Sequence, residues 1–351
     1  MNILFRTDAS PLLGTGHVMR CLALAEACQE LGGAATFLLA SITPAIEQLL
    51  SSHRISVTVS PTQPGSANDA WHAAKIAIEL AADWVVIDGI AFGEAYQKEL
   101  KSTGLRLLVL DDHAASGHWY ADLILNQNYG VRAAGYENRE PNTELFLGPR
   151  FALLRQEFGR WRDWHREVTP QARRVLITMG GSDPDNLTLQ IVKAIATHAP
   201  EMEMTVVVGP SNPHVATLRA VTASVRCDLV VNATNISDLM AKSELAVIVA
   251  GGTLWELLFM EVATLSYARD ALQDEVVNAL LNQRVIHHLG SVSGFDAKAL
   301  VESLRDLAGS KNRRRSMGMA GRQIVDGLGA FRMAYALRQT SLSTPRSITM
   351  Q

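Results

Sequence analysis

Short apolar runs alternate with longer amphipathic stretches along the first half of the chain. Residues 2–5 form an apolar run, residues 7–16 a loop with two glycines, and residues 17–31 a stretch whose apolar positions recur at helical spacing. This pattern predicts a strand, a loop and a helix. Further apolar runs predict strands at 36–39, 84–87, 105–110 and 122–125, with a helix at 71–81.

The same alternation restarts after residues 160–170, a stretch rich in Trp, Arg, His and Glu that ends in proline. We interpret this stretch as a domain boundary. Beyond it the pattern predicts strands at 174–178, 205–208, 229–231, 245–249 and 264–267, helices at 187–196, 236–241 and 254–260, and a helical tail at 312–339.

Strand–helix alternation with apolar strands predicts an α/β fold with parallel, doubly wound sheets. We expect two Rossmann-like domains, residues 1–160 and 161–351, which face each other across a cleft. The first would carry the chemistry, and the second, with the final helix, would bind a nucleotide.

Composition excludes several classes of protein. The 351 residues are 48% apolar, enough for two cores, and the net charge of −3 gives no reason to expect a nucleic-acid groove or membrane surface as partner. Cys21, Cys28 and Cys227 form no CxxC or zinc pattern, and their sparse, odd number fits a reducing cytoplasm. We expect a cytoplasmic protein without signal peptide, membrane span, metal or cofactor, while its oligomeric state stays open.

The motif Gly14-Thr15-Gly16-His17 joins the first strand to its helix. Glycine lets a ligand approach the backbone, and a helix N-terminus attracts anions. An imidazole at this position is suited to general-base catalysis near neutral pH. The alternative is a capping or packing histidine.

Other polar residues follow the predicted strands of the first half. Arg6 and Asp8 flank the same loop, and Asp88 and Asn126 end two later strands. Ligands of doubly wound sheets bind beyond the carboxyl ends of strands, so these side chains are candidates for substrate contact. Asp8 could orient His17 or hold a sugar hydroxyl. It could equally cap its own loop. The alternative for Asp88, Asp111, Asp112 and His113 is likewise that they are loop or N-cap residues.

The second half has two similar turns, Gly180-Gly181-Ser182 and Gly251-Gly252-Thr253, each between a strand and a helix. Two turns of glycine and hydroxyl residues suit a diphosphate held by backbone N–H groups. Glu256, one helical turn later, could accept hydrogen bonds from ribose hydroxyls. The alternatives are ordinary turns and a helix-terminal acid.

Taken together, these motifs resemble the UDP-2,4-diacetamido-2,4,6-trideoxy-β-L-altropyranose hydrolases of pseudaminic acid biosynthesis, relatives of the GT-B glycosyltransferases and of the enzyme that forms lipid II. The matching stretches lie almost end to end: 6–10, 14–21, 110–112, 121–128, 147–155, 179–186, 250–256 and 325–332.

The resemblance implies a metal-independent enzyme in which His17 draws a proton from the water that attacks the anomeric carbon. It also implies two groups of binding residues. The sugar side would comprise Arg6, Asp8, Gly14, Gly16, Arg20, Asp88 and Asn126. The UDP side would comprise Gly180, Gly181, Ser182, Gly251, Gly252, Thr253, Glu256 and Gln273.

Three stretches depart from the family pattern. Ala271-Leu272-Gln273 replaces an acid-Asn-Gln run, Asp88-Gly89-Ile90 replaces Asp-His-Tyr, and Glu261-Val262-Ala263 replaces Gly-x-Pro. Leu272 cannot form the hydrogen bond of the family's asparagine. Three functions therefore remain open: a UDP-sugar hydrolase, a glycosyltransferase with an acceptor other than water, and a nucleotide-sugar-binding protein with weakened catalysis.

Overall fold

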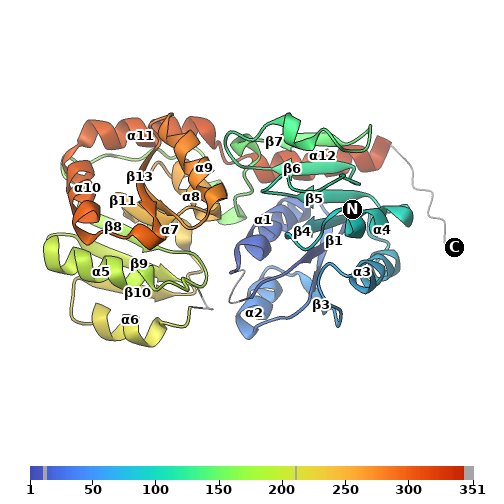
Figure 1. Cartoon of the computed structure of the whole chain (residues 1–351), viewed down its shortest axis with the longest axis horizontal. Coiled ribbons are helices and arrows are strands. Elements are labelled where there is room, and N and C mark those ends of the chain that lie inside the picture. Colours follow the sequence, from blue (N-terminus) through green and yellow to red (C-terminus); the bar gives the residue numbers. More distant parts are fainter. Residues whose placement is uncertain (11–13, 210–211, 344–351) are drawn as a thin grey trace. The chain divides into compact units, whose positions relative to one another are not determined.

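The chain folds into two compact units, each built on one parallel β-sheet (Figure 1). This computed structural model describes residues 1–10, 14–209 and 212–343, so residues 11–13 of the loop expected at 7–16 lie outside the described part. The first unit contains Met1–Ser10, His17–Gln156 and the segment from Leu328 onward. The second contains Glu157–Gly327, and residues 14–16 group with it. The structure confirms the predicted α/β class with two doubly wound sheets.

The first unit has a seven-stranded sheet in the order β3-β2-β1-β4-β5-β6-β7. The chain starts near the middle, runs outward to β3 and returns to the other side of β1, as in doubly wound folds. The strands are β1 (Asn2–Thr7), β2 (Ala34–Leu39), β3 (Ser56–Val59), β4 (Trp84–Asp88), β5 (Leu107–Leu110), β6 (Leu123–Asn126) and β7 (Glu144–Leu147). The helices are α1 (Gly16–Glu30), α2 (Pro44–Ser52), α3 (Ala67–Glu79), α4 (Glu94–Ser102) and, from the end of the chain, α12 (Gly329–Ser343).

Both faces of this sheet are buried. In β1, Ile3 and Phe5 join the core formed with α1, α2 and α12, whereas Leu4 joins the core formed with α3 and α4. A strand covered on both faces requires apolar residues at consecutive positions. The uninterrupted apolar runs at 3–5 and 84–87 therefore correspond to central strands.

The second unit has a six-stranded parallel sheet in the order β10-β9-β8-β11-β12-β13. Its strands are β8 (Arg174–Thr178), β9 (Glu203–Val208), β10 (Cys227–Val231), β11 (Leu245–Val249), β12 (Ala263–Ala268) and β13 (Ile286–Ser291). Its helices are α5 (Leu187–His198), α6 (Val215–Thr222), α7 (Ile236–Lys242), α8 (Gly252–Phe259), α9 (Ala271–Leu281), α10 (Ala297–Gly309) and α11 (Lys311–Ile324). The loops after β8 and β11 both lie at the carboxyl edge of two neighbouring strands.

The last helix, α12, belongs to the first unit, which corrects the prediction that placed it in the second domain. Met333 and Leu337 are buried in the core to which α1 also contributes, and Nε1 of Trp84 in β4 donates a hydrogen bond to the carbonyl oxygen of Leu337 at 3.1 Å. The predicted tail at 312–339 is two helices, separated where Gly327 has a φ of 76°. Helical periodicity identified the apolar face but not the core that buries it.

The boundary stretch is an ordered part of the second unit. The units divide between Gln156 and Glu157, four residues before the predicted position. The guanidinium group of Arg166 donates hydrogen bonds to carbonyl oxygens at the ends of α7 and α8, including Met240 at 2.8 Å and Met260 at 3.1 Å. The last carbonyls of a helix have no partner within it, so this arginine satisfies two helix ends. Its burial lowers the pKa of Arg166 to about 10.

Within the described ranges, no helix has the length and apolar character that crossing a membrane requires.

Candidate functional site

His17 is the second residue of α1, at the carboxyl edge of the first sheet. Its side chain is 27% exposed, and Nε2 lies 3.9 Å from Oδ1 of Asp88, the last residue of β4. This separation is too long for a direct hydrogen bond but short enough for the carboxylate to stabilise a protonated imidazole. The ring can thus meet solvent while a buried negative charge lies beside it.

Arg20, one helical turn after His17, binds the same carboxylate. Its Nε and Nη2 atoms donate to the two carboxylate oxygens of Asp88, each at 2.6 Å, and its Nη1 atom donates to Oδ1 of Asp112 at 2.8 Å. Asp88 has no exposed side-chain surface. Two parallel N–H···O bonds fix the orientation of a carboxylate more firmly than a single point charge. The pair therefore fixes Asp88 relative to His17.

A second set of hydrogen bonds extends this cluster across β5 and β6. Asn128 donates from Nδ2 to Oδ1 of Asp112 at 3.3 Å, and its backbone N–H donates to Oδ1 of Asn126 at 2.9 Å. Asn126 donates to the hydroxyl of Tyr136, which in turn donates to Oδ2 of Asp111 at 2.5 Å. The loops after three adjacent strands are thus joined into one polar network.

The charges of this network follow from burial and pairing. Burial alone would raise the pKa of Asp112, but the Arg20 guanidinium reverses this effect and holds that pKa below its ordinary value. Burial, reinforced by the Asp88 carboxylate, raises the pKa of the Cys21 thiol well above its ordinary value. Cys21 therefore stays a thiol and donates from Sγ to Asp88 at 3.5 Å, which makes it a packing residue rather than a nucleophile.

Besides Asp88, two further predicted substrate contacts are buried. Arg6 has no exposed side-chain surface, and Asn126 is 1% exposed, with both ends of its amide in hydrogen bonds. We interpret both as residues that position their neighbours. Asp8 is 13% exposed, and its carboxylate accepts from Arg6 and from the backbone N–H of Ala40 at 2.6 Å. Loop capping thus accounts for the hydrogen bonds of Asp8 that the structure shows. The exposed part of its carboxylate is accessible to a sugar hydroxyl.

In the second unit, the loop after β8 has the backbone conformation that its glycines permit. Gly180 has a φ of 85°, a region that favours glycine. A Cβ on Gly209, at the end of β9, would lie 2.3 Å from the carbonyl oxygen of Gly181, so the two loops touch through their backbones. Asp183 accepts hydrogen bonds from the backbone N–H groups of Leu187 and Thr188 at 3.0 Å and caps α5. The carboxylate of this motif therefore has a structural role that the sequence did not reveal.

The loop after β11 leads directly into α8. Gly251 precedes the helix, while Gly252 and Thr253 are its first two residues. The first turn contains no acidic residue, because Glu256 is the fifth residue of the helix. This excludes the alternative that Glu256 is a first-turn acid. A helix N-terminus without a carboxylate of its own keeps its N–H groups suited to an anion.

Gln273 stabilises the start of α9. Its Oε1 atom accepts from the backbone N–H of Arg269 at 2.9 Å, and its own N–H donates to Asp270, which precedes the helix, at 2.8 Å. This reciprocal arrangement resembles a capping box. Arg269 also pairs with Asp185 at 3.2 Å, which joins the loops after β12 and β8. The UDP role of Gln273 stays a prediction.

Tyr136 belongs to the polar network although no sequence pattern points to it. It lies in a single 3₁₀ turn, Ala133–Tyr136, which belongs to no recognisable motif. In the part of the chain that the structure describes, no group of three or more His, Cys, Asp or Glu side chains is arranged to hold a metal ion.

No family model matches the chain. Three relatives align with most of it. It is 28% identical over 267 residues to the UDP-2,4-diacetamido-2,4,6-trideoxy-beta-L-altropyranose hydrolase of Campylobacter jejuni, covering 74% of this chain and 89% of that protein. It is 23% identical over 262 residues to the spore coat polysaccharide biosynthesis protein SpsG of Bacillus subtilis, covering 73% and 76%. An uncharacterized protein of Methanocaldococcus jannaschii is 26% identical over 298 residues, which cover 82% of this chain but only 60% of that protein.

Solved structures show the same fold. MurG of Acinetobacter baumannii has a TM-score of 0.64 at 16% identity, covering 97% of this chain and 100% of that one. The spinosyn rhamnosyltransferase SpnG, complexed with thymidine diphosphate, has a TM-score of 0.67 at 16% identity, covering 97% and 99%. Together with the two parallel sheets, these similarities show a GT-B fold of two Rossmann-like domains.

Proposed function

We propose that this chain is a metal-independent hydrolase that cleaves a UDP-linked 2,4-diacetamido-2,4,6-trideoxy sugar, as a step of pseudaminic acid biosynthesis. The observation that carries the proposal is the placement of His17. A partly exposed imidazole lies 3.9 Å from a buried carboxylate that Arg20 fixes in place. The similarity to the Campylobacter hydrolase, which spans 89% of that protein, supports the choice of substrate.

In the proposed reaction, His17 accepts a proton from water as the water oxygen attacks the anomeric carbon. The bond between that carbon and the β-phosphate oxygen breaks, and UDP leaves from the opposite face of the sugar, so the configuration inverts. Asp88 stabilises the protonated imidazole, much as a buried carboxylate does in other histidine-based sites. N–H groups of the loops after β8 and β11, with the N-terminus of α8, would stabilise the charge of the leaving diphosphate.

A panel of UDP-sugars tests this proposal directly. We expect UDP release from a UDP-linked diacetamido-trideoxy sugar in water alone, with NMR of the first product formed showing a free sugar of inverted anomeric configuration. Retained configuration, or the absence of UDP release from every member of the panel, would contradict hydrolysis by this route.

A glycosyltransferase is the second candidate, and two departures at the proposed sugar side favour it. Leu272 lies where the hydrolase pattern has an asparagine, and Ile90, two residues after Asp88, is 75% exposed. An exposed apolar side chain so close in sequence to Asp88 would suit an acceptor with an apolar face, whose hydroxyl His17 would deprotonate. The panel distinguishes the two functions, because a transferase releases UDP only after an acceptor alcohol is added. A binding protein with weakened catalysis would bind UDP tightly and keep its low turnover when His17 is replaced.

Glu256→Ala is expected to weaken UDP binding by about 1.5–3 kcal/mol, the usual contribution of hydrogen bonds to a charged group. The reason is the loss of a carboxylate that would accept hydrogen bonds from two ribose hydroxyls. Isothermal titration calorimetry with UDP measures the change. Glu302→Ala is the matched control, because Glu302 is an exposed acid on α10 in the same unit. Equal UDP affinity of the Glu256 variant and the control would refute the ribose assignment.

A further inference from the structure

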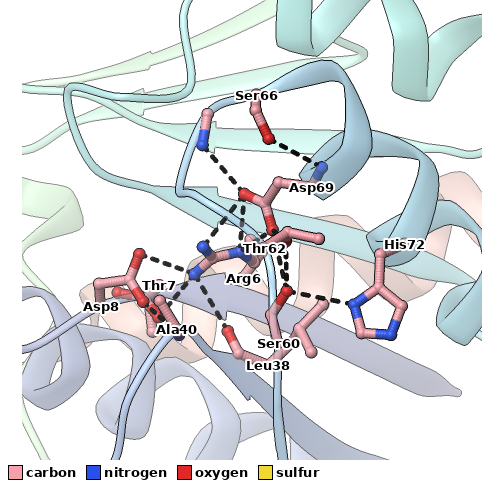
Figure 2. Close-up of polar contacts among 11 residues, drawn as sticks. Arg6, Thr7, Asp8, Leu38, Ala40, Ser60, Thr62, Ser66, Asp69 and His72 are labelled. Carbon is pink, nitrogen blue, oxygen red and sulfur yellow. Dashed lines mark hydrogen bonds and ion pairs between the residues drawn. The ribbon is translucent and has the colours of Figure 1, made fainter.

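Arg6 and Asp69 form an ion pair with no exposed side-chain surface (Figure 2). Arg6 lies in β1 and Asp69 in the first turn of α3, and Nη2 of the arginine is 3.1 Å from Oδ2 of the aspartate. The guanidinium group also lies over the ring of Phe92, 4.8 Å from its centre. Burying two charges removes both from water, and replacing such a pair by apolar residues is often neutral for stability. Stability alone therefore does not account for this pair.

Asp69 accepts hydrogen bonds from several residues of the segment between β3 and α3. Its carboxylate accepts from the backbone N–H of Gly65 at 3.0 Å, from the hydroxyl of Thr62 at 3.0 Å and from the hydroxyl of Ser60 at 3.3 Å. Four donors from separate positions converge on one carboxylate when Arg6 is included. The buried carboxylate of Asp69, itself held by these hydrogen bonds, thus fixes the position of Arg6.

Arg6 also binds a second carboxylate, which lies at the carboxyl edge of the sheet. Its Nη1 atom donates to Oδ2 of Asp8 at 2.8 Å, and Oδ1 of Asp8 accepts from the backbone N–H of Ala40 at 2.6 Å. Asp8 is 13% exposed, whereas Arg6 and Asp69 are fully buried. Along this series of contacts, Asp8 is the charged group that reaches the surface, and it lies in the segment that leads to His17.

We propose that Asp69 and Arg6 are positioning residues that set the carboxylate of Asp8 for contact with a hydroxyl of the substrate. The inference rests on the proposed function in one respect, namely that Asp8 contacts the sugar. It replaces direct binding by Arg6 with an indirect role: the arginine holds Asp8 and the loop after β2 in one arrangement, and Asp69 holds the arginine.

The kinetic test uses four variants: Asp69→Asn, Arg6→Lys, Asp8→Asn and the double variant of Asp8 and Asp69. A small displacement of a positioned group costs up to about 100-fold, so Asp69→Asn is expected to lower kcat/KM by ~10- to 100-fold. Because Asp69 acts through Asp8, the double variant should be no slower than Asp8→Asn alone. Arg6→Lys keeps the charge but cannot pair with both carboxylates, so it should show the same loss of kcat/KM. It replaces Asp69→Asn in the test if that variant does not fold.

Asp122→Asn is the matched control. Asp122 also accepts from a backbone N–H, that of Leu107 at 2.7 Å, and from a cation, Lys101 at 2.7 Å, but it precedes β6 at the opposite edge of the sheet. The control should keep the wild-type kcat/KM. Equal loss of kcat/KM in the control and in Asp69→Asn, or additive losses in the double variant, would overturn the positioning role.

Hydrogen–deuterium exchange gives a second readout that needs no substrate. The Ala40 amide is expected to exchange faster in Asp69→Asn and in Asp8→Asn than in the wild type or in Asp122→Asn. If the wild type releases no UDP, the proposed function fails while this exchange pattern still decides the inference. Unchanged protection of Ala40 in Asp69→Asn would overturn it.

Discussion

Replacing His17 with alanine is expected to reduce UDP release by ~10²–10⁴-fold, the usual contribution of general acid–base catalysis. The variant lacks the group that takes the proton of the attacking water, and no other side chain of α1 near this position can replace it, since burial keeps Cys21 protonated. UDP affinity should stay close to that of the wild type, because the proposed UDP residues belong to the second unit. Steady-state kinetics and UDP titration measure the two quantities.

His53→Ala is the control for this experiment. His53 lies at the end of α2 in the same unit and pairs with Glu26 at 2.8 Å, away from the carboxyl-edge network. The control should release UDP at nearly the wild-type rate. An activity of His17→Ala within a few-fold of the control would rule out the general-base role and favour a binding protein.

The central strands could be predicted because burial on both faces leaves a clear signal in the sequence. β1, β4, β8 and β11 each contain a run of at least three consecutive apolar residues. The missed strands β3, β7 and β13 are sheet edges, where a strand has one neighbour and keeps polar or exposed positions. β13, for example, contains two histidines and a glycine, which match neither strand periodicity nor strand propensity.

The candidate site could be predicted only where it is local in sequence. The motif around His17 and the two glycine turns are local, so their place between strand and helix followed from the pattern. The ion pair of Arg6 with Asp69 joins residues 63 positions apart, and Tyr136 reaches Asp111 across 25. Such pairs depend on how the strands are ordered in the sheet, which no spacing in the sequence specifies. Long-range order likewise decides that α12 contributes to the same core as α1.

Replacing Arg20 with methionine is expected to lower the free energy of unfolding at neutral pH by about 3–5 kcal/mol, the cost of removing one partner from buried ion pairs. Arg20 is 12% exposed and neutralises Asp88, which is fully buried, and Asp112. Methionine retains much of the volume but leaves both carboxylates without their cation. Urea unfolding followed by circular dichroism measures the loss.

Rescue and pH dependence distinguish charge from packing in this variant. In the wild type the folded-state pKa of Asp112 lies below its ordinary value, because Arg20 outweighs the effect of burial. The stability that this carboxylate contributes is therefore present above its unfolded pKa, near 4, and is lost as the pH falls through the lower folded value. Without Arg20, burial favours the protonated acid, so the loss of unfolding free energy in the variant should become smaller between about pH 7 and 4.

Adding Asp88→Asn and Asp112→Asn to the Arg20 variant should restore part of its stability at neutral pH. A deficit that is constant with pH and unchanged in the triple variant would mean that Arg20 acts by packing alone, and His17 would then lie beside a carboxylate whose orientation Arg20 does not control.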